Sequence, residues 1–534
     1  MYLVTVEEMR SIEKSACEKG MPYETMMANA GKKLAQVIEA RYTKKRLMLV
    51  TGLVGSGNNG GDTLIALISL QKSGWNTAAL LLKERPNDSL VKNYLDSGGR
   101  MLTSTDHGFA GSTKTVLQAT GVLLDGVLGT GVKLPLKEDA RKFLSLINKE
   151  LAGQTVVAVD CPSGVDCDSG DTAPETIHAE LTVCMEAIKT GLLKFPAFEF
   201  CGEVMAVSIG LEDAIREQNI KRNMLDRDWV KGHLPKRPMT AHKGTFGTVM
   251  VVGGCANYVG APLLSGKAAY RSGSGLVTLA VPQSIHPILA GYFPEAVWLI
   301  LSDEGGVISE LAADTVTNHL SKIDVMVVGP GIGREATTQR FLDELFFPRN
   351  GNGKIRRVGF LVEPENEKIQ KKGLPKLLID ADGLRWLATH DDWHEKINAN
   401  IILTPHPGEM ASLTGLSIDE IQQNRIEVAE VFAKKWKQVL VLKGALTVIA
   451  APDGRTAIVP VASSSLAKAG SGDVLSGMIA SFVGQGLELF DAACVGAWIH
   501  ANAGLSASGK LGGDVSIIAT DIIDAIPHVF SGLR

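Results

Sequence analysis

Short apolar runs that alternate with helix-length segments are the feature that most constrains how this chain folds. The first series of runs covers residues 46–51, 76–82, 121–125, 155–160, 181–185 and 203–208. Several of these runs end in glycine, asparagine or aspartate. Buried parallel strands have this continuous apolar character, and crossover helices connect them. Because the carboxyl ends of parallel strands meet at one edge of a sheet, the pattern predicts an α/β fold with a ligand site at that edge.

The chain contains two such series, which predicts two domains. The second series covers residues 247–252, 275–281, 324–328, 377–380, 400–403, 438–442 and 446–450. Residues 212–240, between the series, are polar and basic, and 534 residues exceed the usual size of one domain. We therefore predict α/β domains over residues 1–225 and 226–534. Apolar spacing predicts that Thr5–Arg41 is helical, and the basic, glycine-rich segment 346–376 is interpreted as an inserted loop.

The composition argues against several classes of protein. A formal net charge of −4 gives no electrostatic basis for binding nucleic acid. The seven cysteines are odd in number and form no C-x-x-C pair, which argues against a disulfide framework or a zinc site. No run of about 18 apolar residues predicts a membrane span, and the first ten residues lack the apolar core of a signal peptide. We expect a cytoplasmic homo-oligomer that binds small molecules, not membranes.

The first glycine-rich loop reads Gly52-Leu-Val-Gly-Ser-Gly-Asn-Asn-Gly-Gly-Asp62 and precedes an apolar helix expected near Thr63. Glycines let backbone amides approach a phosphate, and the N-terminus of a helix favours the anion. The loop is not a clean G-x-G-x-x-G dinucleotide fingerprint, and it is not a P-loop because no Lys-Ser/Thr pair follows. A plain glycine-rich turn with Asp62 as the helix cap stays an open alternative.

Polar residues follow two more of the predicted strands. One strand ends in Asp125, and another ends in Asp160, with Ser163 in the turn that follows. Together with Asn59, Asp125 and Ser163 carry hard oxygens that suit a monovalent cation. Asp160 at a strand end is a candidate acid or base. Either aspartate could instead be a turn or capping residue.

The second domain carries a denser set of loops. They include Thr404-Pro-His-Pro-Gly-Glu409, Lys443-Gly-Ala-Leu-Thr447 and Lys468-Ala-Gly-Ser-Gly-Asp473. Gly-Ser-Gly at the start of the apolar helix Val474–Val483 forms an anion site from backbone amides. Asp473, in the first turn, is then a candidate base for a hydroxyl nucleophile in phosphoryl transfer. A capped turn in which Asp473 only complements the helix dipole is the less favoured interpretation.

The first half resembles a known family. The segments GSGNNGGD, LLDGVLGTG and VAVDCPSGVDCDSG resemble the NAD(P)H-hydrate epimerases, which have a Rossmann-like domain, over residues 1–215. The resemblance implies that Asp160 contacts the reacting ring and that potassium is bound by Asn59, Asp125 and Ser163. The residues that it implies as the cradle of the hydrated nucleotide are Asn58, Asn59, Gly60, Gly61, Asp62, Gly129, Thr130, Gly131, Val132, Lys133, Leu134 and Pro135.

The second half resembles the ADP-dependent NAD(P)H-hydrate dehydratases of the ribokinase-like superfamily. The resemblance covers residues 240–285, 324–333 and 377–525, and the segment 346–376 is not part of the pattern. It implies substrate contacts from Ala261, Gly331, His406 and Asp473. It implies an adenine-nucleotide site at Lys443, Gly444, Ala445, Leu446, Thr447 and Gly472. We expect Mg²⁺ because ADP is a phosphoryl donor, without a named ligand.

Together the resemblances imply a bifunctional enzyme that repairs nicotinamide nucleotides. Its isomerase activity would interconvert the R and S forms of hydrated NADH and NADPH. Its lyase activity would dehydrate the S form while ADP becomes AMP and phosphate. Two alternatives stay open: a kinase of the hydroxyethylthiazole or pyridoxal type, which leaves the N-terminal loops unexplained, and a non-catalytic sensing or scaffold module.

Overall fold

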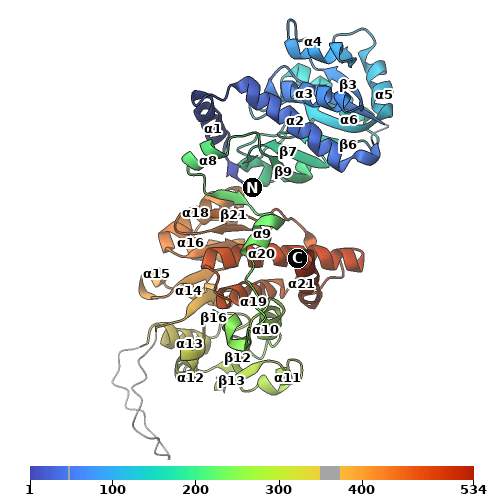
Figure 1. The fold of residues 1–534 in the computed structure, drawn as a ribbon. Coiled ribbons are helices and arrows are strands. Elements are labelled where there is room, and N and C mark those ends of the chain that lie inside the picture. Colours follow the sequence, from blue (N-terminus) through green and yellow to red (C-terminus); the bar gives the residue numbers. More distant parts are fainter. Residues whose placement is uncertain (46–47, 349–372, 534) are drawn as a thin grey trace, which may run out of the picture. The chain divides into compact units, whose positions relative to one another are not determined.

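The computed structural model describes residues 1–45, 48–348 and 373–533. The chain divides into two compact units, Met1–Met224 and Leu225–Arg534 (Figure 1). Most of the predicted inserted loop at residues 346–376 lies outside the described residues. Within the described part of the chain, no helix combines the length and the apolar character that a membrane crossing requires.

The first unit is built on a parallel sheet. Its strands lie in the order β4-β3-β2-β5-β6-β7-β9, and every neighbouring pair is parallel. The bounds are β2 Leu49–Val54, β3 Asn76–Leu81, β4 Arg100–Thr103, β5 Thr120–Gly126, β6 Thr155–Val159, β7 Leu181–Met185 and β9 Glu203–Val207. Shorter strands are β1 Leu3–Val4, β8 Ile188–Lys189 and β10 Arg222–Met224. The strand order reverses between β2 and β5, which opens a crevice at the carboxyl edge.

Helices cover both faces of this sheet. Their bounds are α1 Val6–Glu18, α2 Tyr23–Arg41, α3 Asn58–Lys72, α4 Ser89–Asp96, α5 Phe109–Ala119, α6 Glu138–Glu150, α7 Phe198–Cys201 and α8 Glu212–Glu217. One buried cluster joins α1, α2 and α3 to the sheet, and a second joins α5 and α6 to its other face. Alternate strand residues enter the two clusters, for example Leu123 and Leu124, because a strand presents successive side chains to opposite faces.

The second unit contains a larger mixed sheet. Its strands lie in the order β21-β20-β19-β18-β17-β16-β11-β12-β13, parallel from β19 to β13 and antiparallel from β19 to β21. The bounds are β11 Thr248–Val252, β12 Leu276–Pro282, β13 Val297–Leu301, β16 Val325–Val328, β17 Lys376–Ile379, β18 Ile401–Leu403, β19 Val439–Leu442, β20 Val448–Ala450 and β21 Thr456–Ile458. A small hairpin pairs β14 Asp303–Glu304 with β15 Val307–Ile308.

The core of the second unit packs α10, α19, α20 and α21 against one face of its sheet. The helix bounds are α9 Arg227–His233, α10 Ala261–Arg271, α11 His286–Ala290, α12 Ala312–His319, α13 Ala336–Phe346, α14 Asp382–Leu387, α15 Trp393–Lys396, α16 Pro407–Thr414, α17 Ile418–Gln423, α18 Arg425–Trp436, α19 Ser471–Gly484, α20 Leu489–Leu511 and α21 Ala519–Leu533. Helix α19 consists mostly of apolar and small residues because most of it is buried between the sheet and other helices. The predicted α/β fold class is confirmed.

Three predicted boundaries are wrong. Strand β2 occupies Leu49–Val54, not 46–51, and helix α3 begins at Asn58, not near Thr63. The early start requires glycine: a Cβ on Gly60 would lie 2.1 Å from the Gly55 carbonyl oxygen, so only glycine lets the first helical turn pack there. The helix expected over Thr5–Arg41 is two helices, α1 and α2, because Gly20 has a left-handed φ of 97°.

Candidate active sites

The first candidate site is a cavity of about 580 Å³ in the first unit. It lies at the carboxyl ends of β2, β5 and β6, where the reversed strand order makes the following loops diverge. The sequence-predicted residues that line it are Asn58, Asn59, Asp62, Gly129, Thr130, Gly131, Val132 and Asp160. Those outside the lining are Gly60, Gly61, Lys133, Leu134 and Pro135.

The three residues predicted to hold potassium gather beside this cavity. Ser163 donates to Asp125 Oδ2 from its backbone nitrogen at 2.8 Å and to Oδ1 from its hydroxyl at 2.5 Å. The Asn59 amide donates to the carbonyls of Leu128 and Val159 at 2.8 and 2.7 Å. Asp125 is fully buried, and burial raises the pKa of its carboxyl despite the Ser163 bonds. The cluster is therefore rich in oxygen and contains a buried acid.

Asp160 is held in a strained position at the end of β6. Its φ of 65° lies in the left-handed region, which residues other than glycine rarely adopt. Its Oδ1 accepts a hydrogen bond from the Met185 N–H at 2.9 Å and forms an ion pair with the Lys189 ammonium. Lys189 is almost completely buried. Burial, the largest single effect, lowers the pKa of Lys189, but the Asp160 carboxylate and the nearby cysteines together raise it above its ordinary value.

Sequence reasoning missed three side chains of this cavity. Arg10 and Glu13 reach it from α1, and Lys189 reaches it from β8. Burial raises the pKa of Glu13 and of Asp62, and the nearby Asp160 carboxylate raises both further. The available signal for Lys189 was a single lysine inside the apolar run Leu181–Leu193. The resulting site combines one buried ammonium with several carboxyl groups that differ in their affinity for protons.

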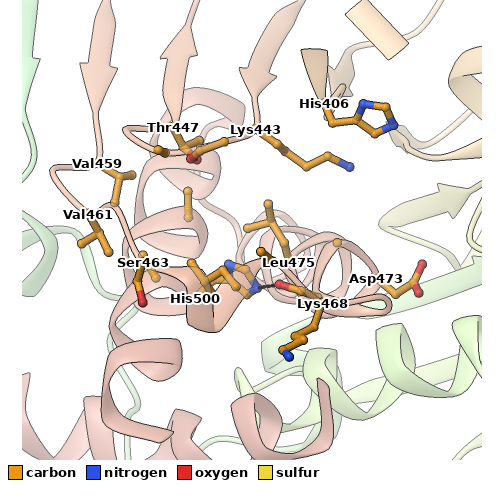
Figure 2. A pocket seen from close by; sticks show the side chains of 18 of the residues that line it. His406, Lys443, Thr447, Val459, Val461, Ser463, Lys468, Asp473, Leu475 and His500 are labelled. Carbon is orange, nitrogen blue, oxygen red and sulfur yellow. Dashed lines mark hydrogen bonds between the residues drawn. The ribbon is translucent and has the colours of Figure 1, made fainter. Parts of the chain in front are cut away.

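The second candidate site is a cavity of about 430 Å³ in the second unit, between the loop after β19 and the start of α19 (Figure 2). The sequence-predicted residues that line it are His406, Lys443, Gly444, Ala445, Thr447, Gly472 and Asp473. Leu446 is buried and lies outside the lining, as do Ala261 and Gly331. Ala261 and Gly331 adjoin each other, because a Cβ on Gly331 would lie 2.9 Å from that of Ala261.

A buried lysine occupies the charged end of this cavity. Lys443 Nζ lies 2.8 Å from Asp380 Oδ1 and 3.7 Å from Glu409 Oε2. Asp380 is almost completely buried, and the Ser476 hydroxyl donates to its other oxygen. These contacts fix the ammonium beside the first turn of α19, where a Cβ on Gly472 would lie 3.4 Å from it. Sequence analysis assigned no role to Asp380, which ends the predicted strand 377–380.

The carboxyl groups at this end have unusual proton affinities. Burial, with a contribution from the Asp380 carboxylate, raises the pKa of Asp473 to about 7, although Lys443 opposes the shift. Burial raises the pKa of Glu409 to about 7 in the same way. Burial and the Lys443 charge lower the pKa of His406, whose Nδ1 accepts the Gly408 N–H at 3.0 Å at the start of α16. Asp473 can therefore both accept and release a proton near neutral pH.

The other end of the cavity is apolar. Figure 2 shows Asp473, His406 and the Lys443 amine toward one side, and Val459, Val461 and Ser463 toward the other. His500 lies beneath, 3.1 Å from the Ser471 hydroxyl, and complete burial lowers the pKa of its ring to about 4, so the ring is neutral. An elongated cavity with one charged and one apolar end suits a nucleotide with its phosphates at the charged end.

Comparison with known proteins identifies the family of this chain. The family model described as NAD(P)H-hydrate dehydratase matches residues 249–528, and the model described as YjeF-related protein N-terminus matches residues 23–191. The bifunctional NAD(P)H-hydrate repair enzyme of Moorella thermoacetica is 34% identical, and the match covers 100% of this chain and 97% of that protein. The chain belongs to this family.

Two further proteins are similar to this chain in sequence. The Escherichia coli enzyme of the same description is 30% identical, with 98% of this chain and 93% of that protein covered. The crystal structure of the ADP/ATP-dependent NAD(P)H-hydrate dehydratase from Bacillus subtilis, co-crystallised with ATP/Mg²⁺, is 26% identical, covers 58% of this chain and 99% of that chain, and superposes with a TM-score of 0.47. The predicted family and the prediction of an enzyme are confirmed.

Proposed function

We propose that the first unit interconverts the R and S epimers of hydrated NADH and NADPH, and that the second unit dehydrates the S form with ADP as the phosphoryl donor. Family membership supports both activities. The observation that carries the proposal is the pairing, in the second cavity, of Asp473 with the buried Lys443 ammonium at the N-terminus of α19. Such a pairing supplies a base for a hydroxyl beside an electrostatic clamp for a phosphoryl group.

Dehydration needs a better leaving group than hydroxide. In the proposed reaction Asp473 takes the proton of the C6 hydroxyl, and the resulting oxygen attacks the terminal phosphoryl of ADP while AMP leaves. The lone pair of the ring nitrogen then expels phosphate, and loss of the C5 proton restores the double bond. A pKa of about 7 lets Asp473 accept the first proton under the conditions in which the reaction must run.

The nucleotide is proposed to lie with its phosphates at the charged end of the cavity. Lys443 and the amides of Gly444, Ala445 and Gly472 would face the phosphates, while Thr447 and the apolar end would hold the nucleoside. Mg²⁺ is proposed to accompany the phosphates. Among the described residues no group of three or more His, Cys, Asp or Glu side chains could hold a metal ion, which fits a cation bound mainly by phosphate and water oxygens.

Epimerisation needs only that the C6 hydroxyl leave and return. The ring nitrogen assists loss of the hydroxyl, which yields a flat iminium ion, and water then adds to either face. We propose that Asp160 gives and takes the proton in these steps. Its carboxylate lines the cavity beside the loops at residues 57–62 and 127–132, as the role requires. The remaining predicted cradle residues, together with Ala261, Gly331, His406 and Leu446, stay proposed binding residues.

Potassium is proposed to bind at Asn59, Asp125 and Ser163. The donor set fits, because a carboxylate, a hydroxyl and an amide oxygen are hard ligands. Asp125 is fully buried and forms no ion pair within the described part of the chain, and a buried carboxylate is costly without a counter-charge. A bound cation would supply that charge and order the loops on either side. Assembly as a homo-oligomer and residence in the cytoplasm stay predictions.

The test is incubation of the purified protein with mixed hydrate epimers, with and without ADP, followed by chromatographic separation of the products. Without ADP, we expect an unequal starting mixture to approach equilibrium between the R and S forms. With ADP, we expect all hydrate to become NADH or NADPH, with AMP and phosphate formed in equal amounts. Conversion that proceeds equally well without any nucleotide would refute the proposed dehydration mechanism.

A further inference from the structure

The buried lysine of the first cavity has no role in the reaction as described so far. We infer that Lys189 is a positioning residue for epimerisation, whose ammonium holds the Asp160 carboxylate in one orientation toward the hydrated ring. The inference rests on the proposed epimerase function of the first unit.

The geometry fixes one oxygen of the carboxylate and leaves the other available. Asp160 Oδ1 receives both the Met185 N–H, at 2.9 Å, and the Lys189 ammonium. Oδ2 accepts no hydrogen bond from the residues that the structure describes. The Asp160 side chain is 14% exposed and lines the cavity, so a proton acceptor remains on the side where substrate would enter. The two donors thus prevent rotation of the carboxylate without blocking its reactive oxygen.

The backbone around Lys189 is built to keep this side chain in place. Lys189 ends the two-residue strand β8, whose register pairs Val4 with Lys189 and Leu3 with Ile188 in parallel. The side chain itself is 1% exposed. Asp160 has a left-handed backbone conformation with a φ of 65°, which is strained and persists only where the surroundings enforce it. The strained backbone of Asp160 and its ion pair with Lys189 therefore both fix the position of this carboxylate.

The electrostatic surroundings explain why one ammonium matters. Glu13, Asp62 and Asp160 all line the cavity, and Arg10 lies at its lining on α1. Burial raises the pKa values of Glu13 and Asp62, and the nearby Lys189 charge opposes both shifts. Without Lys189, Asp160 Oδ1 would keep only the Met185 N–H, and the carboxylate would lose its ion-pair partner and its fixed orientation.

The experiment measures epimerisation by the full chain without ADP, so that the second unit consumes no hydrate. Lys189→Met keeps the length of the side chain and removes its charge. We expect kcat for epimerisation to fall on the order of 10²-fold or more, with a much smaller change in KM. ADP-dependent dehydration of the S epimer by the same protein should keep its wild-type rate. The matched control is Lys83→Met, which removes a lysine from an exposed ion pair with Asp139, and it should epimerise normally.

A second variant separates positioning from folding. Lys189→Ala opens space next to the cavity, and added ethylammonium should restore epimerisation, whereas tetramethylammonium at the same ionic strength and potassium concentration should not. A purely structural lysine would give no such rescue. Wild-type protein that fails to epimerise hydrate would refute the proposed function itself. Wild-type activity retained by Lys189→Met, or a folded Lys189→Ala that ethylammonium does not restore, would overturn the inference while leaving the proposed function intact.

Discussion

At the scale of single residues, we expect Asp473 to support dehydration and to lower the stability of the folded protein. Asp473→Asn should lower ADP-dependent dehydration by about 10²–10⁴-fold, because an amide cannot accept the hydroxyl proton. Epimerisation should continue at its normal rate. Recovery of absorbance at 340 nm measures the first activity, and separation of epimers measures the second. Near-normal dehydration in the variant would remove Asp473 from the mechanism.

The same substitution has an expected effect on thermal stability. The folded-state pKa of Asp473 is raised to about 7, so the stability that its protonation contributes is fully present below its unfolded pKa, near 3.8, and is lost as the pH rises through about 7. Above that pH the ionised group destabilises the ligand-free protein. Asp473→Asn should therefore raise Tm at pH 8 by a few degrees, and by less at pH 5. Differential scanning calorimetry at both pH values checks the sign.

Potassium should distinguish Asp125 from Asp160 in the first unit. Asp125→Ala and Asp160→Ala should both slow epimerisation, the first by weakening the proposed cation site and the second by removing the proposed proton carrier. Raised potassium should partly restore Asp125→Ala and leave Asp160→Ala inactive, because mass action compensates only for lost affinity. Initial rates over a range of KCl concentrations at constant ionic strength provide the measurement. Equal restoration of the two variants would assign Asp160 to the ion site.

At the scale of elements, the first turn of α3 depends on close backbone contact. Gly60→Ala would place a Cβ 2.1 Å from the Gly55 carbonyl oxygen, so the helix start must move away from the loop. We expect loss of epimerisation and destabilisation of the first unit by about 1–3 kcal/mol. Gly111→Ala in the first turn of α5 is the matched control, because nothing lies within 4 Å of a Cβ there and Gly111 is outside the cavity lining. Urea unfolding and epimer separation measure the two effects, and equal behaviour of the two variants would contradict this account.

At the scale of the whole molecule, the two units should work as separate enzymes. Each contains its own sheet, core and cavity, so residues 1–224 and 225–534 are expected to fold when expressed alone. The second fragment should convert the S fraction of mixed hydrate and then slow to the rate of spontaneous epimerisation. Addition of the first fragment should restore complete conversion. Fast, complete conversion by the second fragment alone would show that the epimerase role is misassigned.

The local sequence pattern was sufficient to predict the α/β class and the loops that follow the strands. Apolar runs such as 181–185 became strands at the expected positions, because a strand buried on both faces needs a continuous apolar segment. The motif ending in Asp473 likewise opens α19 as expected, since glycine and serine are well suited to a helix start. These features depend on neighbours in the chain, which a sequence displays directly.

Tertiary structure alone decided which distant side chains share a cavity and what charge each carries. Glu13, Asp62 and Lys189 lie far apart in the sequence, and only the sheet brings them to Asp160. The start of α3 at Asn58 depended on the space beside Gly60, which no local pattern records. The pKa of about 7 at Asp473 arises from burial and from Asp380, more than ninety residues earlier in the chain. Desolvation and charge proximity are properties of packed space, so they exist only after the chain has folded.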